Sequence, residues 1–200
     1  MLKGIIFDFD GVLFDDYEEH YDIYIRKYKN MNREVHRKAF EGNIIESKEK
    51  LLVKDNSVDI KKELKELLFK KGIYKNVLDI LKKLKKKYKL FIITSTWEEN
   101  ILEYLKKEKL SNLFDEILGL NSGKFKKDKF EVLINKYKFS RGEVVFITDT
   151  LGDILESNNI GIKSIGVDFG YHERERLEKG IPYKIVSNFD ELYKEVLKIN

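Results

Sequence analysis

The chain has 200 residues, 42% of them hydrophobic and 12% aromatic, which is enough to bury one good core with or without a small accessory domain. Charged residues make up 37% but nearly cancel to a net charge of +4, which argues against a nucleic-acid-binding domain. The absence of cysteine excludes disulfides, thiolate nucleophiles and zinc–thiolate sites. No apolar run approaches the ~18 residues of a membrane span, and the first residues lack a signal-peptide pattern. We therefore expect a cytoplasmic protein without membrane or nucleic-acid partners.

The first apolar segment, residues 2–9, predicts a buried strand that ends in acidic residues. Asp8 and Asp10 stand two residues apart, and Gly11 follows at once and permits a sharp turn. Ligands of open α/β sheets bind at the carboxyl ends of strands, so the two carboxylates are expected to face a cation or a proton there. A polar turn is the plain alternative. A calcium loop of the EF-hand type is excluded because glycine directly follows Asp10.

From residue 16 to residue 72 the pattern is helical and no strand is predicted. A first helix is indicated by apolar and aromatic residues at helical spacing, namely Tyr21, Tyr24, Ile25 and Tyr28. Further helices are predicted over residues 33–40 and from an N-cap at Asp59 to Gly72, whereas residues 43–57 are ambiguous. We interpret residues 16–72 as a small helical domain inserted into a core made of residues 1–15 and 73–200.

After Gly72, predicted helices and strands alternate, which is typical of βαβ units and a parallel sheet. The strands are expected at residues 90–94, 116–120, 144–148 and 164–167. The helices are expected at residues 76–88, 98–107, 128–138, 153–158 and 190–197. The fold class is therefore predicted to be α/β, with a doubly wound parallel sheet. Because such crossovers are right-handed, the carboxyl ends of the strands share one edge. The basic run at residues 82–89 lies on a predicted helix and is expected to be a solvated face.

Polar residues directly follow three of the predicted strands, and we expect them to converge on one crevice. These residues are Asp8, Thr94 and Asp149. Several acids beside a hydroxyl suit Mg²⁺, which prefers oxygen ligands. Asp8 is a candidate nucleophile because aspartate can form an aspartyl-phosphate, and Asp10 is a candidate general acid and base. Asp149 would complete the metal site, and Asp153, four residues later, could hold a metal-bound water or simply cap a helix.

Three segments resemble the motifs of one family: Asp8-Phe-Asp10-Gly11-Val-Leu-Phe-Asp15, Phe91-Ile-Ile-Thr94-Ser95 and Val145-Phe-Ile-Thr148-Asp149-Thr-Leu-Gly-Asp153. In this order they resemble the haloacid dehalogenase-like (HAD) hydrolase superfamily, in its phosphoglycolate phosphatase/β-phosphoglucomutase branch. The resemblance covers nearly all of the chain. It departs from the family pattern at Thr148, where glycine is usual, and at Gly152, where asparagine is common.

The resemblance implies a Rossmann-like core, a helical cap over residues 16–72, and an Mg²⁺-dependent phosphatase that forms an aspartyl-phosphate. Asp8 and Asp10 are then the catalytic residues. The metal site would include Asp8, Asp10 through its backbone carbonyl, Asp149 and Asp153. A small phosphorylated metabolite is the expected substrate, and a monomer or small homo-oligomer the expected state. The alternatives are a phosphomutase of the β-phosphoglucomutase type, a non-catalytic phosphorylatable receiver or binding module, and a nucleic-acid-processing phosphatase.

The phosphate is expected to contact Thr94, Ser95 and a lysine, because phosphoryl transfer needs a cation on the phosphoryl oxygens. This branch usually shows Lys-Pro-x-Pro-[Glu/Asp]-x-Phe. The segment Lys124-Phe-Lys-Lys-Asp128-Lys-Phe130 keeps the spacing of lysine, acid and phenylalanine but lacks both prolines. We assign Lys124 to the phosphate, with Lys127 as the second candidate.

The remaining candidates are expected to have structural roles. The three histidines, His20, His36 and His172, lack metal-ligand spacing and are assigned to packing or to the surface. Trp97 could contact substrate or pack at the rim. Asp15 is expected to brace the first loop and is left outside the catalytic set.

Overall fold

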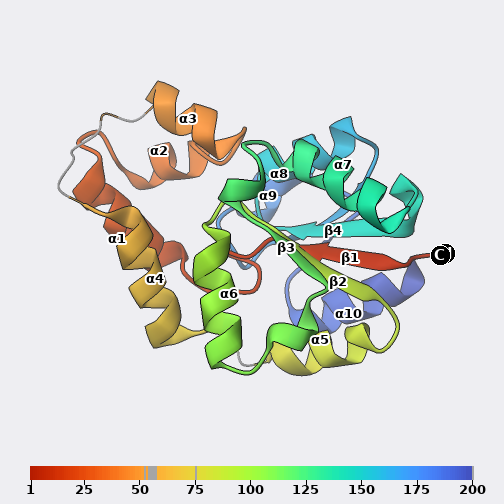
Figure 1. Cartoon of the computed structure of the whole chain (residues 1–200). Coiled ribbons are helices and arrows are strands. Elements are labelled where there is room, and N and C mark those ends of the chain that lie inside the picture. Colours follow the sequence, from red (N-terminus) through yellow and green to blue (C-terminus); the bar gives the residue numbers. More distant parts are fainter. Residues whose placement is uncertain (52, 54–57, 75, 200) are drawn as a thin grey trace.

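A computed structural model describes residues 1–51, 53, 58–74 and 76–199. Six parallel strands form one sheet in the order β3-β2-β1-β4-β5-β6 (Figure 1). The strands are β1 Gly4–Phe7, β2 Lys89–Ile93, β3 Glu116–Leu118, β4 Val144–Thr148, β5 Lys163–Val167 and β6 Lys184–Val186. The strand order reverses between β1 and β4, which is where doubly wound sheets bind their ligands. The predicted fold class is confirmed.

Helices cover both faces of the sheet (Figure 1). On one face lie α5 (Val77–Lys85), α6 (Glu98–Lys107) and α10 (Phe189–Lys198). On the other lie α7 (Lys126–Tyr137), α8 (Leu151–Asn159) and α9 (Arg174–Glu178). Successive strand residues point to opposite faces, so Ile5 and Phe7 join the larger apolar cluster while Ile6 joins the smaller one. This double cover explains why the strands are almost wholly apolar.

Four helices separate β1 from α5 and pack beside the sheet (Figure 1). They are α1 Tyr17–Lys27, α2 Arg33–Lys38, α3 Ile44–Leu51 and α4 Ile60–Lys71. We call residues 16–72 the helical segment. Its own small apolar cluster includes Tyr24, Tyr28 and Leu64 and is distinct from the two clusters that cover the sheet. The predicted N-cap is confirmed, because the Asp59 side chain accepts a hydrogen bond from the Lys62 amide at 3.1 Å. Within the ambiguous stretch 43–57, residues 52 and 54–57 lie outside the described residues.

The largest differences from prediction are at element boundaries. β1 spans four residues rather than the predicted stretch 2–9, α7 begins two residues earlier than predicted, and α8 begins at Leu151 rather than at residue 153. The three-residue β6 and the five-residue α9 were not predicted, because such short elements carry little periodic signal. None of the helices in the described part of the chain is long and apolar enough to span a membrane.

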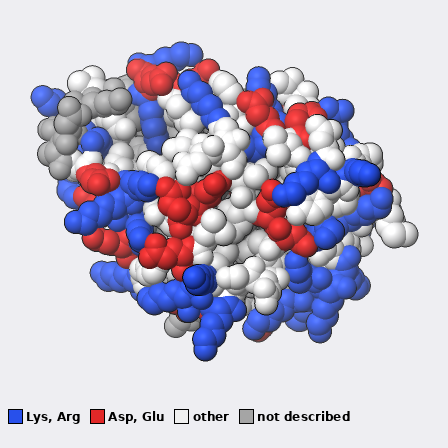
Figure 2. Space-filling view, viewed as in Figure 1, with Lys and Arg blue, Asp and Glu red and all other residues white. Residues whose placement is uncertain are grey.

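Charged side chains of both signs are interspersed over the helical segment, while lysines and arginines gather where α5 and α10 lie (Figure 2). The basic run at residues 82–89 contributes to this area. Lys82, Lys83 and Lys86 are exposed, while the Leu81 and Leu84 side chains face the core. The part of the run on α5 is therefore a solvated helix face, as expected, whereas α5 ends at Lys85 and Lys89 belongs to β2.

Candidate active site

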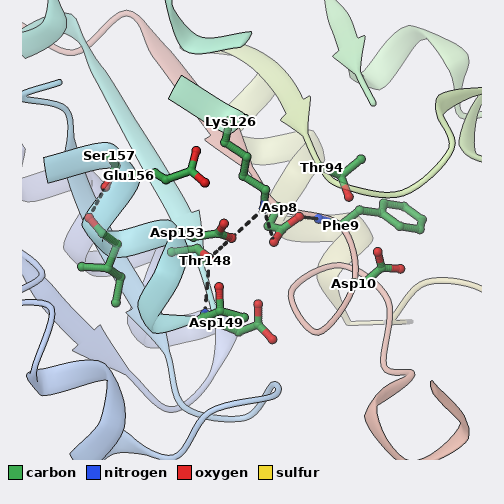
Figure 3. Close-up of polar contacts among 12 residues, drawn as sticks. Asp8, Phe9, Asp10, Thr94, Lys126, Thr148, Asp149, Asp153, Glu156 and Ser157 are labelled. Carbon is green, nitrogen blue, oxygen red and sulfur yellow. Dashed lines mark hydrogen bonds and ion pairs between the residues drawn. The ribbon is translucent and has the colours of Figure 1, made fainter. Parts of the chain in front are cut away.

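The carboxyl ends of the three central strands form one polar edge. Asp8 directly follows β1, Thr94 follows β2 and Asp149 follows β4. These residues line one cavity of about 40 Å³ together with Asp10 and Asp153 (Figure 3). The structure thus brings together the side chains that the sequence predicted to converge.

Asp8 is buried at the centre of this edge. Its Oδ1 accepts a hydrogen bond from the Phe9 amide at 2.7 Å, and its Oδ2 lies 2.6 Å from the Nζ of Lys126 (Figure 3). Burial raises the pKa of Asp8 well above its ordinary value, with a contribution from the nearby Asp153 and Asp149 carboxylates, and Lys126 opposes this rise. The ammonium of Lys126 is thus the group that favours an ionised Asp8.

Lys126 is the first residue of α7 and is only 3% exposed. Its Nζ lies between two carboxylates, 2.6 Å from Asp8 and 2.5 Å from Asp153. Burial alone lowers the pKa of Lys126, but the two carboxylates outweigh burial and raise it. Burial likewise opposes ionisation of Asp153, but Lys126 and the Thr148 hydroxyl, which donates to Asp153 at 2.7 Å, hold its pKa below the ordinary value. Lys126 is therefore a charged lysine at the centre of the acidic cluster.

The assignment of Lys124 is corrected by this arrangement. The Lys124 side chain is 43% exposed and lies 3.9 Å from Glu49, and it does not line the cavity. Lys127, the second candidate, is tied through its amide to Glu156 at 3.0 Å and does not line the cavity either. The error arose because the lysine was chosen by the family spacing of lysine, acid and phenylalanine, which selects Lys124. The helix begins at Lys126, and the side chain of that first residue reaches the strand ends (Figure 3).

Asp10 is less buried than Asp8 and lines the same cavity. Its Oδ2 accepts a hydrogen bond from the Thr96 hydroxyl at 2.5 Å. Burial raises the pKa of Asp10, and the Thr96 hydrogen bond lowers it in opposition. An acid whose pKa is raised is suited to donate a proton near neutral pH. Sequence reasoning missed Thr96, since nothing in the sequence marks a residue that contacts Asp10 across the sheet edge.

Asp149 approaches the first loop so closely that only glycine fits opposite it. Gly11 has a φ of +72°, and a Cβ at that position would overlap the Asp149 carboxylate. The Asp149 Oδ2 accepts from the Tyr171 amide at 2.7 Å, whereas its Oδ1 is buried without a hydrogen-bond partner. Burial raises the pKa of Asp149 to about 7. A buried, unpartnered carboxylate oxygen is costly unless a cation or donor binds it.

The residue that braces the first loop is Asp16 rather than Asp15. The Asp16 side chain accepts hydrogen bonds from the Gly11 amide at 3.1 Å and from the Tyr171 hydroxyl at 2.9 Å. The Asp15 side chain is 54% exposed and lies 3.7 Å from Lys71. The prediction named the wrong member of two adjacent aspartates, which the sequence pattern alone does not distinguish.

The carboxylates fit an Mg²⁺ ion that takes few protein ligands. Among the described residues, no three histidine or acidic side chains lie close enough together to form a metal site by themselves. Mg²⁺ commonly uses one or two carboxylates and completes its shell with waters and substrate phosphate. Asp8 and Asp149 line the same cavity, and the Asp149 Oδ1 is available as a ligand. The donor set therefore suits a hard cation held jointly with a phosphate.

Thr94 and Ser95 have different surroundings. Thr94 is fully buried, and its Oγ1 accepts from the Thr96 amide at 3.1 Å. The Thr94 carbonyl oxygen accepts from the buried Lys129 ammonium at 2.5 Å. Ser95 is half-buried and lines both this cavity and a second, larger one. The two hydroxyls are thus at the cavity, where a phosphate could meet them.

All three histidines are buried and take part in packing, as expected. His20 Nδ1 and His36 Nε2 lie 2.8 Å apart within a group of aromatic rings. His172 accepts from the Leu151 amide at Nδ1 (3.0 Å) and donates from Nε2 to the Arg37 carbonyl oxygen (2.9 Å). These two partners require the neutral ring, and burial accordingly lowers the pKa of His172 to about 4.

The family is shown by a family model described as haloacid dehalogenase-like hydrolase, which matches residues 5–167. The chain belongs to this family. Among curated proteins, a phosphoglycolate phosphatase of Haemophilus influenzae is 27% identical over 124 residues, which are 60% of this chain and 55% of that protein. The chain thus spans about half the length of the curated relatives it matches.

Solved structures of other proteins share the fold. A haloacid dehalogenase-like hydrolase from Streptococcus pneumoniae superposes with a TM-score of 0.78 at 20% identity, covering 98% of each chain. CbbY from Rhodobacter sphaeroides, solved in complex with phosphate, superposes with a TM-score of 0.74 at 19% identity, covering 96% of each chain. These likenesses support the fold of the HAD chain described here, and the chemistry rests on its own residues.

Proposed function

We propose that this HAD chain is an Mg²⁺-dependent phosphatase that hydrolyses a small phosphorylated compound through an aspartyl-phosphate on Asp8. The observation that carries the proposal is the placement of Asp8, Asp10 and Asp149 around one cavity, with Lys126 paired to Asp8 and Asp153. The name of the H. influenzae relative, phosphoglycolate phosphatase, supports a phosphate ester as substrate.

In the first step an Asp8 oxygen attacks phosphorus and the bond from phosphorus to the ester oxygen breaks. The leaving oxygen takes the proton of Asp10, whose raised pKa keeps a protonated fraction available. In the second step a water molecule attacks the phosphorus of the aspartyl-phosphate and gives its proton to Asp10. The Asp8 carboxylate is then released with inorganic phosphate.

The phosphoryl oxygens would be held by Lys126, Thr94 and Ser95, with Lys126 in the role first assigned to Lys124. Lys126 is charged and already lies 2.6 Å from the nucleophile, so it can contact a phosphoryl group bound to Asp8. Asp153 keeps the ammonium in place through the 2.5 Å contact. This makes Asp153 a positioning residue for the lysine as well as a candidate for holding a metal-bound water.

The metal ligands would be the Asp8 and Asp149 carboxylates and the Asp10 backbone carbonyl. Bound Mg²⁺ would neutralise charge on the phosphoryl oxygens during transfer. The unpartnered Oδ1 of Asp149 supports its place in this set.

We propose that the helical segment, residues 16–72, is a cap on a core of residues 1–15 and 73–200. It meets the core beside the active site. The Gly152 amide donates to the Phe40 carbonyl oxygen at 3.0 Å, and the Asn43 side chain donates to Glu156 at 2.9 Å. Arg176 of the core pairs with Glu34 and Glu41 of the helical segment. These contacts support a cap that lies over the cavity, where it would shape the choice of substrate.

The deciding experiment is a screen of phosphorylated metabolites with Mg²⁺, in which released phosphate is measured for wild type, Asp8→Asn and Asp15→Asn. We expect Asp8→Asn to lose about 10⁴-fold or more of the activity. The exposed Asp15→Asn control should stay close to wild type. Circular dichroism would check that both variants fold. Full activity of Asp8→Asn would falsify the assignment of the nucleophile.

Two other outcomes would replace the proposal. Isomerisation of a hexose 1-phosphate without phosphate release would indicate a phosphomutase. A stable phosphorylated protein without turnover would indicate a receiver module.

A further inference from the structure

A second, larger cavity adjoins the catalytic one. Its volume is about 300 Å³, and it lies between the helical segment and the loop that follows β2. Asp10, Ser95 and Tyr171 line both cavities, so the two spaces meet at these side chains. A phosphate ester with its phosphoryl group beside Asp8 would therefore place its leaving group beside Asp10 and extend into the larger cavity.

The walls of this cavity are mainly aromatic and aliphatic. The residues that matter for its chemistry are Tyr24, Tyr28, Trp97, Ile44, Ile60 and Leu64. Flat aromatic side chains favour stacked or edge-on contact with another ring, and apolar walls favour ligands that bury apolar surface. A two-carbon acid such as glycolate offers neither a ring nor much apolar surface to these walls.

One cation, Lys48 of α3, lies on the wall of this apolar cavity. Its Nζ lies 4.9 Å from the centre of the Tyr24 ring, and no carboxylate of the described residues lies within ion-pair distance of it. The neighbouring Glu49 also lines this cavity, but its carboxylate pairs with Lys124 at 3.9 Å rather than with Lys48. Burial lowers the pKa of Lys48 to about 8, with Asp10 opposing, so the ammonium is mostly charged at pH 7. A charged group in such surroundings calls for an anionic or accepting partner.

We propose that the substrate is a phosphate monoester whose leaving group carries a flat, largely apolar ring with an anionic or hydrogen-bond-accepting substituent. The ring packs against the aromatic walls and the substituent binds Lys48. This inference rests on the proposed phosphatase activity, because that activity places the phosphoryl group at Asp8. It deepens the proposal by naming the class of leaving group.

The test compares kcat/KM for 4-carboxyphenyl phosphate, phenyl phosphate and phosphoglycolate. We expect the carboxylated ring ester to exceed phosphoglycolate by about tenfold or more, with phenyl phosphate between them. Lys48→Met should reduce kcat/KM for 4-carboxyphenyl phosphate by about tenfold and change that for phenyl phosphate by less than about threefold. The control is Lys50→Met on the same helix, since the Lys50 side chain is 74% exposed. Preference for phosphoglycolate, or an equal loss on both ring esters, would overturn the inference.

A binding experiment separates failure of this inference from failure of the phosphatase proposal. Trp97 is the sole tryptophan of the chain and lines the larger cavity, so its fluorescence reports occupancy. Titration of the Asp8→Asn variant with 4-carboxyphenyl phosphate should give a saturable change in Trp97 emission, and phosphoglycolate should give little. If wild type hydrolyses phosphate esters but Trp97 does not respond to the ring ester, the inference fails and the phosphatase proposal stands. If Trp97 responds saturably but no ester is hydrolysed, the cavity assignment is supported and the phosphatase proposal fails.

Discussion

The polar edge of the sheet and the larger cavity beside the helical segment differ in which elements position their side chains. At the sheet edge, each polar residue is placed by the single strand that precedes it, as Asp8 is by β1 and Asp149 by β4. The larger cavity instead takes its walls from several helices, with Tyr24 on α1, Ile44 on α3 and Leu64 on α4. The comparison teaches that short local patterns can specify a polar sheet edge, whereas the larger cavity depends on how several helices pack.

Among the predictions that test this comparison, the largest change in kcat is expected from Lys126, with Lys124 as its control. Lys126→Met should lower kcat by about 10²–10³-fold, because it removes the cation that lies between Asp8 and Asp153. Lys124→Met, a matched change on an exposed side chain, should alter kcat by less than about twofold. Steady-state kinetics at saturating Mg²⁺ measures both. Equal losses in the two variants would contradict the placement of Lys126.

A second prediction concerns the contact between the helical segment and the core. A Cβ at Gly152 would overlap the Gly42 carbonyl oxygen and lie 2.9 Å from that of Phe40. Because both neighbours are backbone, Gly152→Ala should destabilise the fold by about 1–3 kcal/mol. The matched control is Gly142→Ala, since nothing lies within 4 Å of a Cβ there. Urea unfolding followed by circular dichroism measures both, and equal midpoints for the two variants would refute the close contact.

A third prediction uses the pKa of Asp149, which burial raises to about 7. The ionised carboxylate binds a cation, so protonation below pH 7 should weaken Mg²⁺ binding. The half-saturating Mg²⁺ concentration should rise about tenfold as the pH falls from 8 to 6, because the ionised fraction falls by that factor. Activity titrations with Mg²⁺ at fixed pH give this quantity. A half-saturating concentration that stays constant over this range would exclude Asp149 as a titrating ligand.

The smallest expected effect concerns Thr96 and Asp10. The Thr96 hydroxyl donates to the Asp10 carboxylate at 2.5 Å and lowers its pKa. Thr96→Val should therefore raise the pKa of Asp10 and move the alkaline limb of the kcat/KM profile upward by about one pH unit. Thr96→Ser keeps a hydroxyl and should keep the wild-type profile. A downward shift in the valine variant would contradict the role of Asp10 as the acid.

Much of the core could be predicted because its signals are local. An apolar run that ends in an acid identifies a buried strand and its polar end together, as for Asp149 after β4. Parallel topology then brings the strand ends to one edge without knowledge of any side-chain contact. The prediction failed for Lys126, because the family spacing of lysine, acid and phenylalanine selected Lys124, whereas the lysine that lines the cavity is the first residue of α7.

Side-chain contacts between residues far apart in the chain could not be predicted from the sequence pattern. Thr96 against Asp10 and Asp16 against Tyr171 join residues far apart in the chain, and neither pair follows a periodic pattern. The structure also explains why glycine stands at position 152, where asparagine is common in the family. Gly152 lies against the backbone at Gly42, where an asparagine side chain has no room.

Part of the attachment of the helical segment is made by its main chain. The carbonyl oxygens of Arg37 and Phe40 accept from His172 and from the Gly152 amide, and these bonds do not depend on the identity of the side chains at residues 37 and 40. Substitutions at residues 37 and 40 therefore leave these two hydrogen bonds in place, whereas the contacts of Glu34, Glu41 and Asn43 with the core depend on their side chains. Because Phe40 also lines the larger cavity, selection can change the lining there while this main-chain hydrogen bond and the carboxylates at the sheet edge stay in place.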